Sequence, residues 1–249
     1  MTTSHTVALF VTCLVDLFRP SAAFAAVKLL QDAGCTVSVP QAQTCCGQPA
    51  YNSGDKKNAS ALAAQTIRSL MDYDYVVVPG GSCAAMIKHH YPELLAGDAA
   101  LAGAARALAG KTHELTQFLH EVMHYKPAVS GGEKITYLDS CSGLRELTIK
   151  DQPRAMLGSR IVENQDSETC CGFGGTFCVK YTSVSTAMAD KKLYRLAATG
   201  AVLVAGGDLG CLMHLAGRAA RRDMKLQFRH VAEILAGDDQ TPAIAAEEK

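Results

Sequence analysis

Short apolar runs alternate with longer amphipathic segments along the whole chain. The runs have the apolar, β-branched character of buried strands, and they cover residues 6–13, 36–40, 75–78, 134–141 and 201–205. The segments with apolar positions at helical spacing cover residues 22–33, 56–71 and 183–198. Gly34 and Gly200 follow two of these segments and are helix stop signals. Strands and helices therefore alternate, which predicts an α/β fold with mostly parallel sheet and right-handed crossovers.

The order of these elements is the same in the two halves of the chain. The first strand of each half ends at a cysteine, and the later strands each lead through a glycine pair to another cysteine. A third similarity pairs residues 113–119 with residues 229–235. Such a long repeat predicts two similar Rossmann-like domains that arose by internal duplication.

A stretch rich in Pro, Ser and Gly, residues 125–133, separates the two halves and is typical of a linker. We therefore place the boundary near residue 128, with a first cysteine-rich domain at residues 1–128 and a second at residues 129–249. The tail from residue 238 is small, polar and acidic, and we expect it to be frayed.

Composition narrows the class of protein. The 249 residues are 48% hydrophobic and 19% charged, which is ordinary for a soluble globular protein with a sizeable core. Lys and Arg number 24, as do Asp and Glu, so no bulk charge attracts nucleic acid, and we expect no nucleic-acid partner. No basic segment precedes the first apolar run, so neither a signal peptide nor a membrane span is predicted, and the expected compartment is the cytoplasm.

Ten cysteines carry most of the chemical information. Thiols stay reduced in the cytoplasm, so this number indicates metal or redox chemistry rather than disulfides. Cys35 lies between a predicted helix and a predicted strand, and we expect it to be a core residue. Eight others form one pattern twice, namely Cys, then Cys-Cys-Gly, then Cys. They are Cys13, Cys45, Cys46 and Cys83 in the first half, and Cys141, Cys170, Cys171 and Cys211 in the second half.

This pattern suits a metal centre in each half. The outer cysteines follow predicted strands, and the carboxyl ends of parallel strands converge on one edge of a sheet. Adjacent cysteines can face one centre only if the backbone turns sharply, which Gly47 and Gly172 allow. Four thiolates bind either an iron–sulfur cluster or structural zinc. The pattern is not that of a zinc finger, because no Cys-x-x-Cys is matched by a second close pair.

The cysteine segments resemble those of the CCG cysteine-rich domain family. This family includes the cysteine-rich iron–sulfur components of heterodisulfide reductase, of glycolate oxidase and of anaerobic glycerol-3-phosphate dehydrogenase, and the chain is most similar to the iron–sulfur subunits of L-lactate utilisation complexes. The resemblance spans residues 7–235. The segments that carry it are residues 10–16 (FVTCLVD), 43–49 (QTCCGQP), 79–83 (PGGSC), 170–175 (CCGFGG) and 208–214 (DLGCLMH).

The resemblance implies an iron–sulfur, electron-transferring subunit of a complex that oxidises L-lactate to pyruvate during growth on lactate. It implies one or two clusters of the [4Fe–4S] type, held by the eight cysteines, and two partner subunits, one of them a ferredoxin-like iron–sulfur protein. L-lactate is a candidate ligand, and the partners are expected to bring the subunit to the inner face of the membrane. The alternatives are a zinc-binding scaffold protein and a thiol or heterodisulfide reductase.

One departure from the family pattern bears on the cofactor. Heterodisulfide reductase relatives have a Cys-x-x-Cys at the third element, which gives five cysteines per site for a non-cubane cluster. Here the earlier position is Gly80 in the first half and Asp208 in the second. Four cysteines per site fit an ordinary [4Fe–4S] cluster or zinc better. Cys178 is either a fifth thiolate of the second site or a spare buried thiol.

Oxidation of lactate also needs a cation for the carboxylate and a base for the hydroxyl proton. The candidates near the cysteines are Arg19, His89, His90, Arg145, His214 and Arg218, and the alternative for each is a solvated helix face. His113 and His230 are expected to be caps or core-edge residues. The two glycine pairs lack a full dinucleotide fingerprint, so they are interpreted as turns and the oxidoreductase is not expected to depend on NAD.

Overall fold

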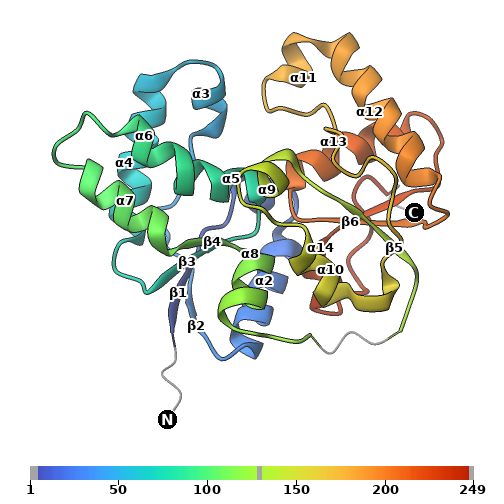
Figure 1. Cartoon of the computed structure of the whole chain (residues 1–249), viewed down its shortest axis with the longest axis horizontal. Helices are drawn as coiled ribbons and strands as arrows, with labels where there is room; N and C mark the ends of the chain where they lie inside the picture. The colour runs from blue at the N-terminus through green and yellow to red at the C-terminus, as the bar shows by residue number, and fades with distance from the viewer. Residues whose placement is uncertain (1–4, 128–130, 247–249) are drawn as a thin grey trace.

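The computed structural model describes residues 5–127 and 131–246. It confirms the predicted α/β class, with two sheets in which every strand pairing is parallel (Figure 1). The first sheet has the order β2-β1-β3-β4 and the second the order β5-β6-β7. The strands are β1 (Thr6–Leu9), β2 (Thr36–Ser38), β3 (Tyr75–Val78), β4 (Thr112–Glu114), β5 (Ile135–Leu138), β6 (Leu203–Gly206) and β7 (Gln227–His230).

Helices follow nearly every strand. Those of the first half are α1 (Cys13–Phe18), α2 (Pro20–Asp32), α3 (Gln48–Asn52), α4 (Lys56–Leu70), α5 (Gly81–Ala85), α6 (Tyr91–Leu94), α7 (Ala102–Lys111) and α8 (Leu115–Gln117), with π-helical turns at Met86–His90 and Phe118–Val122. Those of the second half are α9 (Cys141–Arg145), α10 (Asp151–Leu157), α11 (Phe177–Lys180), α12 (Thr182–Ala197), α13 (Leu209–Ala220) and α14 (Val231–Leu235), with a 3-10 turn at Gly158–Arg160. The three helices predicted from periodicity are α2, α4 and α12.

The second sheet has no full counterpart of β2 among the described residues. In the first half β2 pairs with β1 in the register Thr6↔Thr36. At the equivalent edge of β5, the pairing is reduced to one parallel bridge between Ile135 and Ile161. The duplication is therefore preserved in the central strands and lost at this edge.

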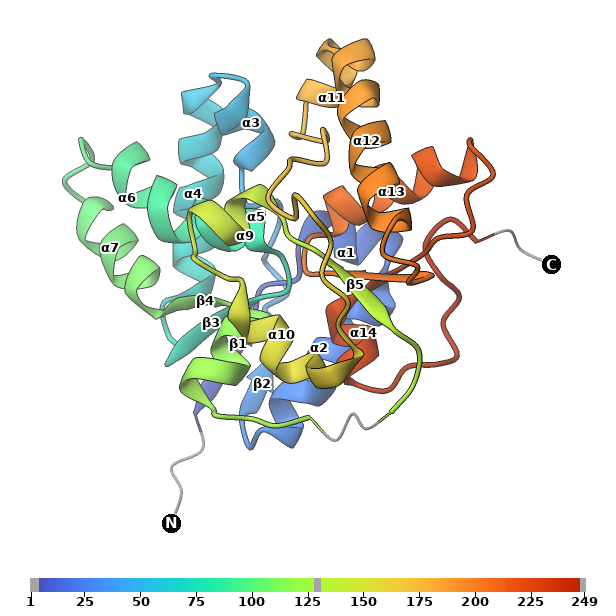
Figure 2. The ribbon, with the colours of Figure 1, turned by 45° about the vertical axis from the view of Figure 1, so that its right-hand side comes forward.

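Helices of each half pack against helices of the other half at their junction. Helix α2 packs against α14 of the second half, while α9 and α10 of the second half pack against α5 and α8 of the first. Figure 2 shows α2 beside α14 and α9 beside α5 at the centre of the molecule. One hydrophobic core consequently contains residues of both halves, among them Leu29, Phe118, Leu203 and Val231.

Two expectations concern the ends of the halves. The boundary predicted at residue 128 lies among residues 128–130, outside the described residues. The prediction of a frayed tail is wrong as far as residue 246, because Ile244 forms an antiparallel bridge with Phe228 and the guanidinium of Arg229 donates to the carbonyls of Asp238 and Thr241. Within residues 5–127 and 131–246, no helix is both long and apolar enough to cross a lipid bilayer.

Candidate functional site

The strand ends place one cysteine of each half at the start of a helix. Cys13 follows β1 as the first residue of α1, and Cys141 follows β5 as the first residue of α9. The preceding hydroxyl residue caps each helix: Thr12 Oγ accepts from the Val15 amide, and Ser140 Oγ accepts from the Gly143 amide. Both cysteines thus follow strands, as predicted, and the same capping interaction holds the start of each helix.

A second cysteine of each half lies in the first turn of the helix that follows the central strand. Cys83 belongs to α5 and Cys211 to α13. Gly80 and Asp208, the positions at which five-cysteine relatives have a further cysteine, are the N-cap residues of these two helices.

The Cys-Cys-Gly elements form sharp turns in both halves. Gly47 has φ of 85° and Gly172 has φ of 88°, a region that favours glycine. The Gly47 amide lies 3.4 Å from Cys45 Sγ, and the Gly172 amide lies 3.4 Å from Cys170 Sγ. The glycines thus provide the turn that the sequence predicted and also aim an N–H donor at sulfur.

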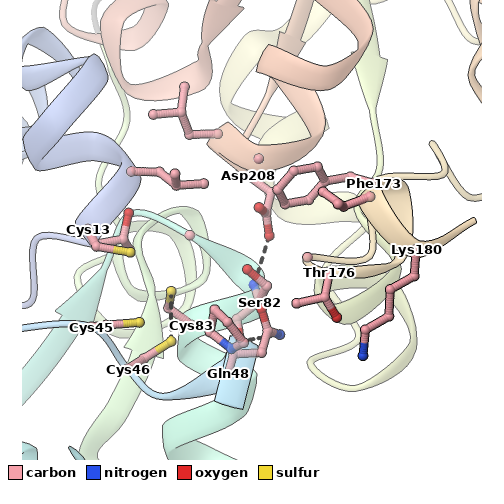
Figure 3. A pocket seen from close by; sticks show the side chains of 18 residues that line it. Cys13, Cys45, Cys46, Gln48, Ser82, Cys83, Phe173, Thr176, Lys180 and Asp208 are labelled. Atoms are coloured by element: carbon pink, nitrogen blue, oxygen red, sulfur yellow. Dashed lines mark hydrogen bonds between the residues drawn. The ribbon is translucent and has the colours of Figure 1, made fainter. Parts of the chain in front are cut away.

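The turns bring the four thiols of the first half together (Figure 3). Cys46 Sγ lies 3.2 Å from Cys83 Sγ. Hydrogen bonding with Cys13 first and with Cys46 second holds the pKa of Cys45 far below that of a free thiol. Cys46 is buried, with 2% of its surface exposed, and the other three are half-buried. We call this group the first thiol set.

The thiols of the second half interact in the same order. Cys141 and Cys171 donate hydrogen bonds to Cys170 and lower its pKa, and Cys171 also interacts with Cys211. Cys171 is buried like its counterpart Cys46. We call this group the second thiol set. The eight cysteines predicted from the repeat are therefore assembled as two sets of four.

The donor chemistry of both sets fits an iron–sulfur cluster or another soft metal, because all the donors are thiols and backbone amides point at sulfur. All these cysteines are free thiols that interact with one another by hydrogen bonds. Among the described residues, no group of three or more His, Cys, Asp or Glu is arranged to hold a metal ion.

A cavity of about 450 Å³ lies between the first thiol set and the second half of the chain. The second half supplies the opposite wall, from the turn that follows Gly172 and from α11. Figure 3 shows Phe173, Thr176 and Lys180 across the cavity from the cysteines. The residues that line it include Leu14, Gln48, Ser82, Phe173, Thr176, Val179, Lys180 and Asp208.

Buried carboxyl groups lie at the junction of the halves. Asp208 Oδ2 accepts from the Ser82 amide at 2.9 Å, so a side chain of the second half holds the residue next to Cys83 (Figure 3). Burial raises the pKa of Asp208. Burial also raises the pKa of Glu114 to about 7, and Asp208 contributes in the same direction.

None of the six charged or histidine candidates lines this cavity, and four of them either form an ion pair elsewhere or face solvent. Arg19 forms an ion pair with the buried Glu233. His90 pairs with Glu146 and Arg218 with Asp190, and His89 is exposed. These positions agree with the alternative interpretation of them as structural or solvated side chains.

The other two candidates lie near the second thiol set. The positive charge of Arg145 lowers the pKa of Cys170, after the larger effects of the neighbouring thiols. His214 lies on α13 with Cys211, its Nε2 3.4 Å from Ser185 Oγ, and its pKa is lowered by burial.

The remaining cysteines and histidines are placed as follows. Cys35 is a core residue, as predicted, with its sulfur 3.8 Å from Met123 Sδ. Cys178 is half-buried, and its thiol donates to the Gly175 carbonyl at 3.2 Å. His230 caps α14, as expected, and His113 lies at the edge of the core against Phe118.

Sequence reasoning missed Thr176 and Lys180 in the cavity wall and Glu114 at the junction. Each is a single polar residue that belongs to no repeated or regularly spaced set in the sequence, so no pattern distinguishes it from surface residues. Only the CCGFGG segment that precedes α11 and Cys178 within α11 drew attention to this part of the chain.

The sequence was also compared with those of known proteins and protein families. The model of the cysteine-rich domain of the CCG family matches residues 7–88 and again residues 135–216. The chain belongs to the CCG cysteine-rich family. The resemblance inferred from the cysteine segments is thereby confirmed, together with the duplication, since the family domain occurs twice.

Similar curated proteins extend over almost the whole chain. Lactate utilization protein A of Geobacillus kaustophilus (strain HTA426) is 45% identical over 234 residues, which cover 92% of this chain and 98% of that protein. Lactate utilization protein A 2 of Bacillus cereus (strain Q1) is 42% identical over 237 residues, with coverages of 92% and 97%. Lactate utilization protein A of Anoxybacillus flavithermus (strain DSM 21510 / WK1) is 43% identical over 234 residues, with coverages of 92% and 98%.

Replacing Gly172 by alanine is expected to lower the free energy of unfolding more than replacing Gly34 by alanine does. Both glycines have similar backbone angles, φ of 88° and 90°, so both substitutions bring similar left-handed strain. A Cβ at Gly172 would lie 2.7 Å from the Ser185 carbonyl oxygen, whereas at Gly34 no described atom lies within 4 Å of it. Gly172→Ala should therefore cost about 1–3 kcal/mol more, measured by urea unfolding. Equal losses for the two variants would contradict the proposed close packing of α12 on the turn.

Proposed function

We propose that this protein is the iron–sulfur, electron-transferring subunit of a complex that oxidises L-lactate to pyruvate and supports growth on lactate. The observation that carries the proposal is the assembly of two four-thiol sets in a chain whose relatives are named for lactate utilization. The proposal includes two partner subunits, one of them ferredoxin-like, and action in the cytoplasm at the inner face of the membrane.

The chain's own residues define what each set contributes. Cys13, Cys45, Cys46 and Cys83 would hold one [4Fe–4S] cluster, and Cys141, Cys170, Cys171 and Cys211 a second. A bound cluster of this kind accepts and releases one electron at a time. The turns at Gly47 and Gly172 present backbone amides to sulfur, and such hydrogen bonds adjust the reduction potential. Cys46 and Cys171 are buried, which limits the access of water to that side of each set.

Elemental analysis of protein purified without oxygen tests the cofactor. The protein should be brown, with broad visible absorption, and should contain about four iron atoms and four sulfides for each occupied set. Electron paramagnetic resonance of the reduced protein should show cluster signals. Colourless protein that contains zinc and no iron after anaerobic reconstitution would favour the zinc-binding scaffold instead.

The substrate is tested with the complete complex. When the two partner subunits are added, L-lactate should bleach the visible absorption of the clusters, and pyruvate should form in proportion. A disulfide substrate should not be reduced, because the Cys-x-x-Cys pairs of the heterodisulfide reductase type are missing from the third elements. Turnover of a disulfide without any response to lactate would contradict the proposal.

A further inference from the structure

A buried lysine lies beside the second thiol set. Lys192 is on α12 and is 0% exposed, and its ammonium donates to the Ser167 carbonyl at 2.6 Å. Ser167 belongs to the segment that leads into Cys170. Full burial of a lysine is rare and costly unless negative charge or strong hydrogen bonds compensate for the lost water. The position of Lys192 therefore calls for a compensating partner nearby.

Asp139 is the first negative group that acts on Lys192, and Cys171, Cys141 and Cys211 of the second thiol set come after it. Helix α12 packs directly on the Cys-Cys-Gly turn, with the Ser185 hydroxyl donating to the Gly172 carbonyl at 2.8 Å. Ala189 and Leu193, which flank Lys192 on the buried face of α12, belong to the same packed core as Cys171. Burial lowers the pKa of Lys192, while the charges of Asp139 and of the set's cysteines act in the opposite direction.

A second cation lies near the same set. The guanidinium of Arg145 donates to the Glu168 carbonyl at 3.3 Å, next to Ser167 in the same segment. Arg145 is in α9, the helix that begins at Cys141, so its guanidinium lies close to both Cys141 and the segment before Cys170. Two positive side chains thus hold the segment before Cys170 by its carbonyls and act on the thiols behind it.

The duplication provides an internal comparison with the first thiol set. Ala59 and Leu62 of α4 lie against Gly47 as Ser185 and Met188 of α12 lie against Gly172. About two helical turns beyond Ala59 and Ser185, α4 has Thr66 and α12 has Lys192. Thr66 is also buried but carries no charge. Lys180 lies across the cavity from the first thiol set, but it is exposed, so water screens its charge.

We propose that the second thiol set holds the cluster with the higher reduction potential, because Lys192 and Arg145 stabilise the additional negative charge of its reduced form. A nearby positive charge favours the more negative redox state, and it does so most strongly where water is excluded. The inference rests on the proposed function, since it requires a cluster in each set. With a cluster in each set, one electron would pass from the reduced first centre to the oxidised second centre, with no exchange of protons or bonds.

Redox titration followed by electron paramagnetic resonance tests this order. Each centre is measured alone, the second in Cys46→Ser protein and the first in Cys171→Ser protein. The second centre should have the higher midpoint potential. Adding Lys192→Met to Cys46→Ser should lower the equilibrium constant for reduction of the second centre about tenfold, or about 59 mV for one electron. The same substitution should leave the potential of the first centre unchanged.

The controls separate charge from structure. Lys191→Met removes an exposed ammonium at the neighbouring position of α12 and should not shift either potential. Arg145→Gln removes the exposed second cation and carries the test if Lys192→Met does not fold; it should lower the second potential as well. Iron content and signal shape are measured for every variant, because Lys192 also anchors Ser167.

Two outcomes would overturn the inference, and they are distinguishable. Clusters in both sets with equal potentials, or a second potential that neither Lys192→Met nor Arg145→Gln lowers, would overturn this inference alone. Anaerobically reconstituted protein without iron would overturn the proposed function, and this inference with it.

Discussion

Cys46→Ser protein is expected to lose the cluster of the first thiol set and to keep that of the second, so that its iron and sulfide content falls by about half. Cys46 is the buried member of its set, and its sulfur contacts both Cys45 and Cys83. A serine hydroxyl is a harder and much weaker ligand for cluster iron than a thiolate. The measurement is iron and sulfide per chain in anaerobically purified protein, with electron paramagnetic resonance of the cluster that remains.

The chain offers two matched controls for this substitution. Cys171→Ser changes the equivalent buried cysteine of the second set and should remove the other cluster. Cys35→Ala changes a buried cysteine whose sulfur lies against Met123 in the core, and it should leave the iron content unchanged. Loss of both clusters in Cys46→Ser protein would mean that the eight cysteines form one shared site.

Arg19→Met protein should be less stable than the unmodified protein by about 3–5 kcal/mol, because a buried carboxylate loses its partner. Glu233 is 0% exposed, and Arg19 donates to its two oxygens at 2.7 Å and 3.1 Å. Ser21 and the His230 amide also donate to this carboxylate, so Glu233 connects the start of α2 with the cap of α14. Urea unfolding without oxygen, at equal cluster content, measures the free energy difference.

The control for this substitution is an exposed ion pair on the same helix. Lys28 lies 2.6 Å from Asp32, but both side chains are largely in water, and such pairs contribute little. Lys28→Met should therefore unfold at nearly the same urea concentration as the unmodified protein. Similar losses in the two variants would contradict the importance of the Arg19–Glu233 pair at the junction of the halves.

The parts of the fold that the sequence predicts are those that depend on local pattern. The apolar run that ends at Cys13 and its repeat at Cys141 predict two strands, and parallel strand ends converge in any α/β fold. The sequence alone therefore assigns the eight thiols to two sets of four. The glycines of the two Cys-Cys-Gly elements predict sharp turns for the same local reason.

Contacts between the halves could not be predicted in this way. Nothing in the pattern of α2 distinguishes a helix that covers its own sheet from one that packs on α14 of the other half. Lys192 lies in a helix that was predicted correctly, but a lysine in an amphipathic pattern is interpreted as a solvent-facing position. Its burial depends on the packing of α12 over the second thiol set, which is a tertiary property.

In the similar segments 113–119 and 229–235, the histidines are offset by one position. His230 and Glu114, rather than His230 and His113, are equivalent, because each is the last residue of its strand and caps the helix that follows. Aligning residues by type therefore misplaces this pair by one position. The physical requirement at the position is a side-chain acceptor for the first amides of the helix.

The packing of helices of one half against helices of the other suggests how such a chain could arise. In a polypeptide with one half alone, the faces of α1 and α2 that contact the second half would be exposed. A second copy of the same half could cover them, and each copy would make the same contacts to the other, as in a two-fold homodimer. Joining the copies end to end makes this association independent of protein concentration. It also releases each copy from symmetry, so that one half can have β2 and Thr66 where the other has a single bridge and Lys192.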